Sequence, residues 1–178
     1  MTDDKIYISI GNNCYPRIYI KNNLNMSKEG GYKTCPFDLC VNTYDSVYKS
    51  IETDFSLFFE NLRLKEGSIN ADGDRSKCGP GGNNITNAYG TIFNHEGSTH
   101  SHIFKEGRND DDYYIRNDFE MFRKRYSQRI ANWKNYINTY KNIVFVCHKY
   151  TSQQVENLTE LFKNKYKDNI ISILNIPN

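Results

Sequence analysis

The sequence lacks any long hydrophobic run, and its first residues lack the features of a targeting segment. No stretch approaches the roughly 20 consecutive apolar residues that a membrane-spanning helix needs. Residues 1–5 are polar and lead directly into an apolar segment, unlike a signal or transit peptide. We therefore expect a soluble, cytoplasmic protein with no membrane partner.

The sequence also lacks an excess of charge of either sign. It has 23 basic and 21 acidic residues among 178, for a formal net charge of +2. Overall electrostatics therefore predict neither a basic nor an acidic partner. One basic cluster lies at residues 123–129, but Asp118 and Glu120 balance it, so a solvated helix face is the simpler interpretation. We expect no nucleic acid partner.

Paired cysteine spacings of the kind that hold structural zinc are absent as well. The five cysteines are Cys14, Cys35, Cys40, Cys78 and Cys147. An odd number without a secretory signal argues against structural disulfides. The adjacent pair Cys147 and His148 would point to opposite faces of a strand. The sequence therefore predicts no metal site and no cofactor.

Hydrophobic periodicity predicts both strands and helices. Residues 5–10 form a short run of β-branched and aromatic residues, typical of a buried strand. Residues 14–24 can begin a helix. Apolar residues recur at steps of three and four along residues 42–62 and again along 112–140, which predicts two amphipathic helices, the second long. Between them, residues 67–90 are expected to be a long loop, followed by a short strand at 88–93.

The C-terminal part gives the clearest indication of fold. Residues 142–147 and 169–176 have the composition of strands, and Thr151 is positioned to cap a helix between them. A strand–helix–strand unit with short links requires parallel strands. We predict an α/β fold: one domain over residues 1–178, with three layers, a mainly parallel sheet, a C-terminal βαβ unit and one long amphipathic helix.

Cys14 is the best chemical candidate. Active groups of open parallel sheets gather beyond the carboxyl ends of the strands, and Cys14 follows the first strand across Gly11, Asn12 and Asn13. A helix beginning there would lower the pKa of the thiol and favour the nucleophilic thiolate. The alternative is a small buried cysteine in a turn, which is a common place for this residue.

Several polar residues could complete a site around Cys14. Four histidines are possible general bases: His95, His100, His102 and His148. His95 is favoured because a strand would hold it on a rigid frame. Asp38 could orient the imidazole as the third member of a triad, or cap the helix that follows it.

The candidate substrate-binding residues are Asn13, Asn94 and Arg129. Asn13 precedes Cys14, and Asn94 precedes His95, so both could face a pocket there. Arg129 lies beside the apolar stripe of the long helix and could reach a carboxylate in the pocket.

Four segments together resemble a family of papain-like cysteine peptidases with members in bacteria and large DNA viruses. They are Ile8-Ser9-Ile10-Gly11-Asn12-Asn13-Cys14, Cys35-Pro36-Phe37-Asp38, Phe93-Asn94-His95-Glu96 and Tyr126-Ser127-Gln128-Arg129-Ile130. The family pattern is Gly-x-x-Cys after a first strand, Pro-Phe-Asp-Trp, Phe-x-His-Asp, and Tyr-x-Arg-Arg-Ile on a long helix. The resemblance covers most of the chain, and for a viral protein it implies the host cytoplasm.

The resemblance implies a thiol hydrolase in which Cys14, His95 and Asp38 match the family cysteine, histidine and aspartate. The sequence departs from the pattern at three positions, Leu39 for Trp, Glu96 for Asp and Gln128 for the first Arg, which concern substrate shape more than chemistry. A papain-like fold joins a helical half to an antiparallel barrel. The C-terminal βαβ unit favours an α/β architecture instead.

The first hypothesis is therefore a cysteine peptidase, or a related thiol hydrolase or acyltransferase, acting on a peptide or protein substrate. A cysteine-containing analogue of an α/β esterase would use the same residues. The alternative is a non-catalytic interaction module, possible for a viral protein directed at its host, with a buried Cys14 and no histidine nearby. A carbohydrate-related role rests only on the fold class and ranks last.

Overall fold

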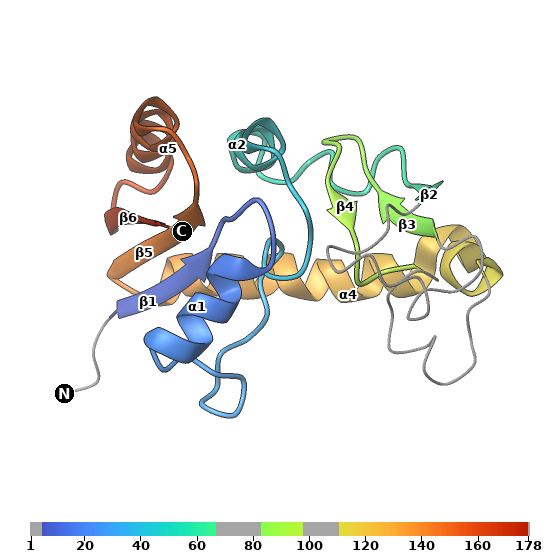
Figure 1. Cartoon of the computed structure of the whole chain (residues 1–178), viewed down its shortest axis with the longest axis horizontal. Helices are drawn as coiled ribbons and strands as arrows, with labels where there is room; N and C mark the ends of the chain where they lie inside the picture. The colour runs from blue at the N-terminus through green and yellow to red at the C-terminus, as the bar shows by residue number, and fades with distance from the viewer. Residues whose placement is uncertain (1–4, 67–82, 98–110, 178) are drawn as a thin grey trace.

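The computed structural model of the chain describes residues 5–66, 83–97 and 111–177 (Figure 1). The elements in chain order are β1 (Lys5–Ser9), α1 (Tyr15–Asn23), α2 (Tyr44–Glu52), β2 (Arg63–Glu66), β3 (Asn83–Thr86), β4 (Ile92–Phe93), α4 (Asp112–Thr139), β5 (Asn142–His148), α5 (Ser152–Lys165) and β6 (Ile170–Ile176). Over these ranges, every helix is too short or too polar to cross a membrane.

A parallel sheet with strand order β1-β5-β6 forms one end of the molecule. Ile8 of β1 lies opposite Phe145 of β5, which in turn lies opposite Ile173 of β6. Helix α5 connects β5 to β6, so the predicted C-terminal βαβ unit is confirmed. The prediction of an α/β fold with a mainly parallel sheet is confirmed with it.

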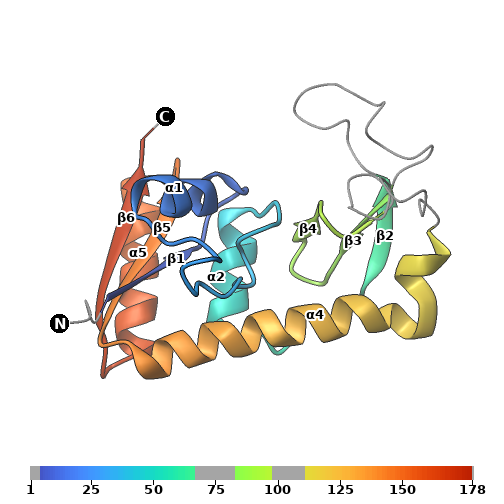
Figure 2. The same cartoon turned by 90° about the horizontal axis from the view of Figure 1, so that it is seen from below.

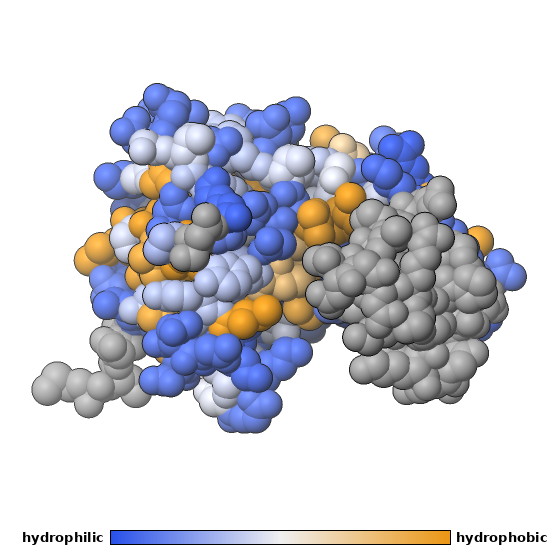
Figure 3. Space-filling view, in the orientation of Figure 1, coloured by the Kyte–Doolittle hydropathy of each residue, from blue (hydrophilic) through white to orange (hydrophobic). Residues whose placement is uncertain are grey.

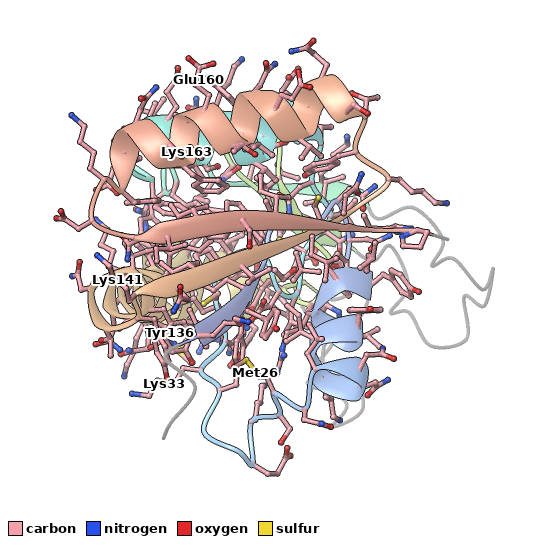
Figure 4. The ribbon with its side chains drawn as sticks, turned by 90° about the vertical axis from the view of Figure 1, so that its left-hand side faces the viewer. Met26, Lys33, Tyr136, Lys141, Glu160 and Lys163 are labelled. Atoms are coloured by element: carbon pink, nitrogen blue, oxygen red, sulfur yellow. The ribbon has the colours of Figure 1, made fainter. Side chains whose placement is uncertain are left out.

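The two faces of this sheet carry alternate residues along each strand, as the pleat requires. Ile8 and Phe145 belong to the main core, which also contains residues of α2, α4 and α5. Tyr7 and Val146 point the other way and pack with Ile20 of α1. Seen from this end, α5 covers one side of the sheet and α1 part of the other (Figure 4). The expected third layer is thus represented by one short helix, and the full three-layer arrangement stays a prediction.

The long helix α4 runs beneath the whole molecule and joins its two ends (Figure 2). It matches the predicted helix at residues 112–140, but its helical geometry is interrupted near the N-terminal end. Asn117, Asp118 and Phe119 there have φ of 49°, 54° and 59°. Asn and Asp tolerate this left-handed backbone better than other residues do, which explains where the bend falls.

A second, antiparallel sheet with order β2-β3-β4 lies beside the other end of α4 (Figures 1 and 2). The sequence analysis missed it. Strand β3 falls inside the predicted loop 67–90, of which residues 67–82 lie outside the described part. The short strand predicted at 88–93 is only Ile92–Phe93.

The helix predicted at 42–62 was too long, because α2 ends at Glu52. Asp54 and Phe55 follow with φ of 53° and 62°, which no α-helix accommodates. The helix begins as capping chemistry dictates, because Thr43 accepts a hydrogen bond from the Ser46 N–H. The predicted cap of α5 is confirmed too, since Thr151 accepts one from the Gln154 N–H.

Candidate active site

Cys14 stands at the N-terminal cap of α1, just beyond the carboxyl end of β1. The placement depends on Gly11, because a Cβ at this position would lie 2.2 Å from Cγ of Pro16. Pro16 occupies the first turn of α1, where its missing N–H costs no helical hydrogen bond. The glycine thus lets the helix start close against the end of the strand.

His95 stands in the turn that follows β4. The Glu96 N–H donates to the carbonyl of Phe93 over 2.8 Å, and the Ile85 N–H donates to the carbonyl of Glu96 over 2.9 Å. Gly97 allows this close approach, because a Cβ there would lie 2.0 Å from the carbonyl oxygen of Asn83. Pairing with β3 therefore fixes the turn that carries His95.

The two segments bring the side chains of Cys14 and His95 together. Cys14 Sγ lies 3.6 Å from His95 Nε2, across 81 residues of sequence. His148 is engaged elsewhere: its Nδ1 lies 3.1 Å from the carbonyl oxygen of Ile176, and its ring packs against Tyr15 at 4.7 Å. The other two candidate bases, His100 and His102, lie outside the described residues.

Burial sets the protonation of Cys14. Loss of solvent raises the pKa of the thiol above its ordinary value, and the negative charge of Asp38 adds to this, while a hydrogen bond from Asn94 opposes it. The predicted helix start at Cys14 is confirmed, but the expected fall in pKa is wrong in direction. Desolvation is the largest influence on this pKa, so Cys14 needs a base to become the thiolate.

Asn94 and Asn13, both predicted to lie near Cys14 and His95, make different contacts. The side chain of Asn94 is within hydrogen-bonding reach of the Cys14 sulfur. Its Oδ1 is buried and has no hydrogen-bond partner among the described residues. Asn13 is exposed, and its Oδ1 accepts the Tyr15 N–H over 2.9 Å, so this side chain stabilises the start of α1. A buried, unpaired amide oxygen makes Asn94 the better placed of the two to meet a substrate.

Asp38 is fully buried and anchors the segment between α1 and α2. Its Oδ1 accepts the Tyr32 hydroxyl over 3.2 Å, and its Oδ2 accepts the Cys35 N–H over 2.7 Å. Arg17 of α1 lies 4.0 Å from Oδ2. Burial raises the pKa of Asp38 to about 6, against the opposing effect of these partners. Each carboxylate oxygen thus has a partner in this segment or on α1, and orientation of His95 by Asp38 stays a prediction.

Glu96 connects the histidine turn to α4. Its buried carboxylate pairs with the guanidinium of Arg125 and lies 3.8 Å from Nη2 of Arg129. The guanidinium of Arg129 also stacks over the ring of Tyr126 at 4.3 Å. The motif at residues 126–130 therefore holds the segment next to His95.

Sequence reasoning missed Asn42, which links the two halves of the site. Its Nδ2 donates to the carbonyl of Gly11 over 3.3 Å and to the sulfur of Cys40 over 3.1 Å. Its Oδ1 accepts the Thr91 hydroxyl over 2.9 Å. One buried amide thus ties the loop before Cys14 to the strand that leads to His95. No local sequence signal marks it, because its partners are distant in the chain.

Among the described residues, no cluster of three or more His, Cys, Asp or Glu side chains is arranged to hold a metal ion. The thiols of Cys35 and Cys40 donate to the backbone carbonyls of Lys33 and Pro36. The cysteines of the described part are all free thiols.

Comparison with known proteins identifies the family. A family model described as "putative papain-like cysteine peptidase" matches residues 5–172. The chain belongs to this family, as the four motifs indicated. No curated protein and no solved structure matches significantly.

Proposed function

We propose that this protein is a cysteine peptidase or a related thiol hydrolase, with Cys14 as the nucleophile and His95 as its base. The observation that carries the proposal is the 3.6 Å contact between Cys14 Sγ and His95 Nε2. A nucleophile and base in contact, on segments that meet only in the folded chain, are the geometric signature of covalent catalysis. The alternative of an interaction module expected no histidine near Cys14, and the contact argues against it.

The reaction begins with proton transfer from the Cys14 thiol to His95 Nε2. The thiolate attacks the acyl carbon of the substrate, forms a C–S bond and leaves a tetrahedral oxyanion. When this intermediate collapses, the C–N bond breaks and the amine leaves with the proton from His95. Water, deprotonated by His95, then hydrolyses the thioester and restores the Cys14 thiol.

Two groups are placed to receive the oxyanion. The backbone N–H of Cys14 lies at the N-terminus of α1, where the helix dipole favours negative charge. The side-chain amide of Asn94 already reaches the Cys14 sulfur. Donors fixed in this way stabilise charge that develops in the transition state.

We assign Asp38 a positioning role. Asp38 lies 4.0 Å from Arg17 of α1, and Arg17 is three residues after Cys14. Asp38 therefore helps to hold the helix that Cys14 caps. Its partners therefore favour support of the nucleophile over direct contact with the base.

Exposed hydrophobic side chains near Cys14 favour a peptide as substrate. Tyr15 and Ile18 of α1 are 40% and 50% exposed, and Val41, paired with Ile92 beside β4, is 38% exposed. In the space-filling view, hydrophobic side chains reach the surface between the two ends of the molecule (Figure 3). Such side chains can bind the apolar residues of an extended chain.

The first experiment measures the rate of iodoacetamide alkylation at each cysteine against pH, by mass spectrometry. At pH 7 we expect Cys14 to react faster than Cys147, whose pKa burial raises to about 12. His95→Ala should slow the alkylation of Cys14 at least about tenfold and shift it to alkaline pH, because the base is gone. The matched control His148→Ala should leave the Cys14 profile unchanged.

Peptidase activity is tested separately by incubating a proteome-derived peptide library with the protein and identifying new termini. Cleavage by the wild type that Cys14→Ala abolishes supports the proposal. An alkylation profile of Cys14 that His95→Ala does not alter would overturn it, and so would cleavage that survives Cys14→Ala.

A further inference from the structure

A cavity lies beside α4, against the segment that precedes Asp38. It has a volume of about 690 Å³ and is lined by Lys33, Thr34, Met121, Lys124, Arg125, Gln128, Arg129 and Asn132. The segment before Asp38 forms one wall. Its position is fixed by the Lys33 N–H, which donates to the Tyr136 hydroxyl over 2.5 Å, and by Asn132 Nδ2, which donates to the Thr34 carbonyl over 2.9 Å. Lys33 and Tyr136 lie side by side in Figure 4.

The described lining of the cavity has an excess of positive charge. It contains the four cations Lys33, Lys124, Arg125 and Arg129 and no acidic residue. Glu96 pairs with Arg125 and lies 3.8 Å from Arg129, and the buried Asp38 also interacts electrostatically with Arg129. Two carboxylates against four cations leave the described lining attractive to an anion.

Arg129 supplies an unused donor. The residue is only 9% exposed, and its Nη1 has no hydrogen-bond partner among the described residues. A buried guanidinium N–H without a partner is costly and marks a position where a ligand oxygen would be stabilised.

Two basic residues of α4 outside the cavity are neutralised by aspartates. Further toward the start of α4, Arg123 pairs with Asp118 at 2.7 Å. Toward its end, Lys134 pairs with Asp54 at 2.7 Å. A nucleic acid strand needs a basic track along its backbone, whereas a hollow between neutralised pairs fits one or two negative charges.

We infer that this cavity binds an acidic side chain of the peptide substrate, receiving its carboxylate on Arg129, Lys124 and Lys33. The identification of the ligand as a peptide rests on the proposed function. Arg125 and Arg129 of the lining both interact with Glu96, the residue next to His95, so the cavity lies close to the catalytic pair and an extended peptide could reach both. Planar guanidinium groups favour a carboxylate or phosphate oxygen over an uncharged amide.

The test uses ¹H–¹⁵N NMR titration of the Cys14→Ala protein, so that binding is measured without turnover. The probes are glutamate and glutamine blocked at both ends, inorganic phosphate, and a short single-stranded DNA oligonucleotide. We expect the glutamate probe to shift the signals of Thr34, Gln128 and Asn132 saturably, and to bind about tenfold more tightly than the glutamine probe. The double variant Lys33→Ala/Lys124→Ala should lose this preference, because both lysines are exposed and line only the cavity.

Lys134→Ala is the matched control, an exposed lysine of the same helix outside the cavity, and it should keep the preference. Equal binding of the glutamate and glutamine probes, or of neither, overturns the inference. Tighter binding of phosphate or of the oligonucleotide than of the carboxylate overturns it as well. Because the protein in this assay lacks Cys14, these outcomes are independent of whether the wild type cleaves peptides.

Discussion

The half of the molecule that carries Cys14 and the half that carries His95 are held together by different means. Strands β5 and β6 pair over seven residues, and Phe145 in their middle is fully buried, with its ring 3.8 Å from that of Phe162. Strands β2 and β3 have four residues each and β4 has two. A sheet this small is not stable by strand pairing alone, so the position of His95 must depend on something else.

Helix α4 supplies that support through residues of one motif. Phe93 of β4 packs against Phe122 and Tyr126, each at 4.7 Å between ring centroids. One turn after Tyr126, Arg129 reaches Glu96. The helix therefore contacts the residue two positions before His95 and the residue one position after it. The nucleophile is thus placed by a sheet, and the base by aromatic and ionic packing on a helix.

The largest expected effect comes from removing that packing with Phe93→Ala. Truncating a fully buried phenylalanine costs about 4 kcal/mol in free energy of unfolding, and the loss falls on the half that has little else. Urea unfolding followed by tryptophan fluorescence measures it. Cys14 alkylation at pH 7 should slow as in His95→Ala, because the turn loses its support.

Phe145→Ala is the control in the parallel half, with a similar expected loss of stability. Where the protein remains folded, it should leave the His95-dependent alkylation intact. If the alanine variants do not fold, Phe93→Leu and Phe145→Leu serve the same comparison. Equal effects of the two on Cys14 alkylation would contradict the division of roles.

The next largest effect is a pH dependence of the free energy of unfolding that comes from Asp38. Burial raises its pKa from 3.8 to about 6, so between these values the folded protein holds a proton that the unfolded chain releases. The contribution of Asp38 to the free energy of unfolding is therefore full below pH 4 and falls as pH rises to 6, by about 3 kcal/mol. We expect the stability difference between wild type and Asp38→Asn to change by this amount between pH 4 and 7.

Asp54→Asn is the control, an exposed aspartate that pairs with Lys134. The change with pH that is specific to Asp38 is the part that this variant does not reproduce. The NMR titration of His95 in Asp38→Asn separates the two roles considered for Asp38. An unchanged His95 titration agrees with support through Arg17, and a shifted one would mean that Asp38 acts on the imidazole directly.

The two glycines beside the catalytic candidates should tolerate alanine differently. At Gly97 a Cβ meets the backbone carbonyl of Asn83, whereas at Gly11 it meets the ring of Pro16. Gly97→Ala should cost about 2 kcal/mol, since backbone must move. Gly11→Ala should be rescued largely by adding Pro16→Ala, which removes the clashing ring. Failure of this rescue would show that Gly11 is needed for the backbone and not for the close approach of α1.

The parallel half of the molecule was easier to predict from the sequence than the antiparallel half. The βαβ unit was predictable because β5 and β6 are rich in β-branched and other apolar residues and Thr151 with Gln154 forms a capping box. The antiparallel sheet was not, because Arg63–Glu66 and Asn83–Thr86 are short and mostly polar. Their places at strand ends and the motif resemblance both indicated Cys14 and His95, but nothing local indicated that Asn42 bridges them. Nor could a local helix argument predict that burial raises the pKa of Cys14, since burial is a property of the whole fold.

The smallest effect tests whether the two halves unfold together. Thr151→Ala removes the N-cap of α5 and should cost about 1 kcal/mol. Helix α5 packs against β6 and α2, and one core contains Leu158 of α5 together with Ile85 and Phe93 of the antiparallel sheet. Amide hydrogen exchange should therefore lose protection by the same factor, about fivefold, in β5 and in β3. The matched cap variant Thr43→Ala in α2 should do the same. Loss of protection confined to β5 and β6 would mean that the half carrying Cys14 can open alone, which would separate the nucleophile from its base without unfolding the rest.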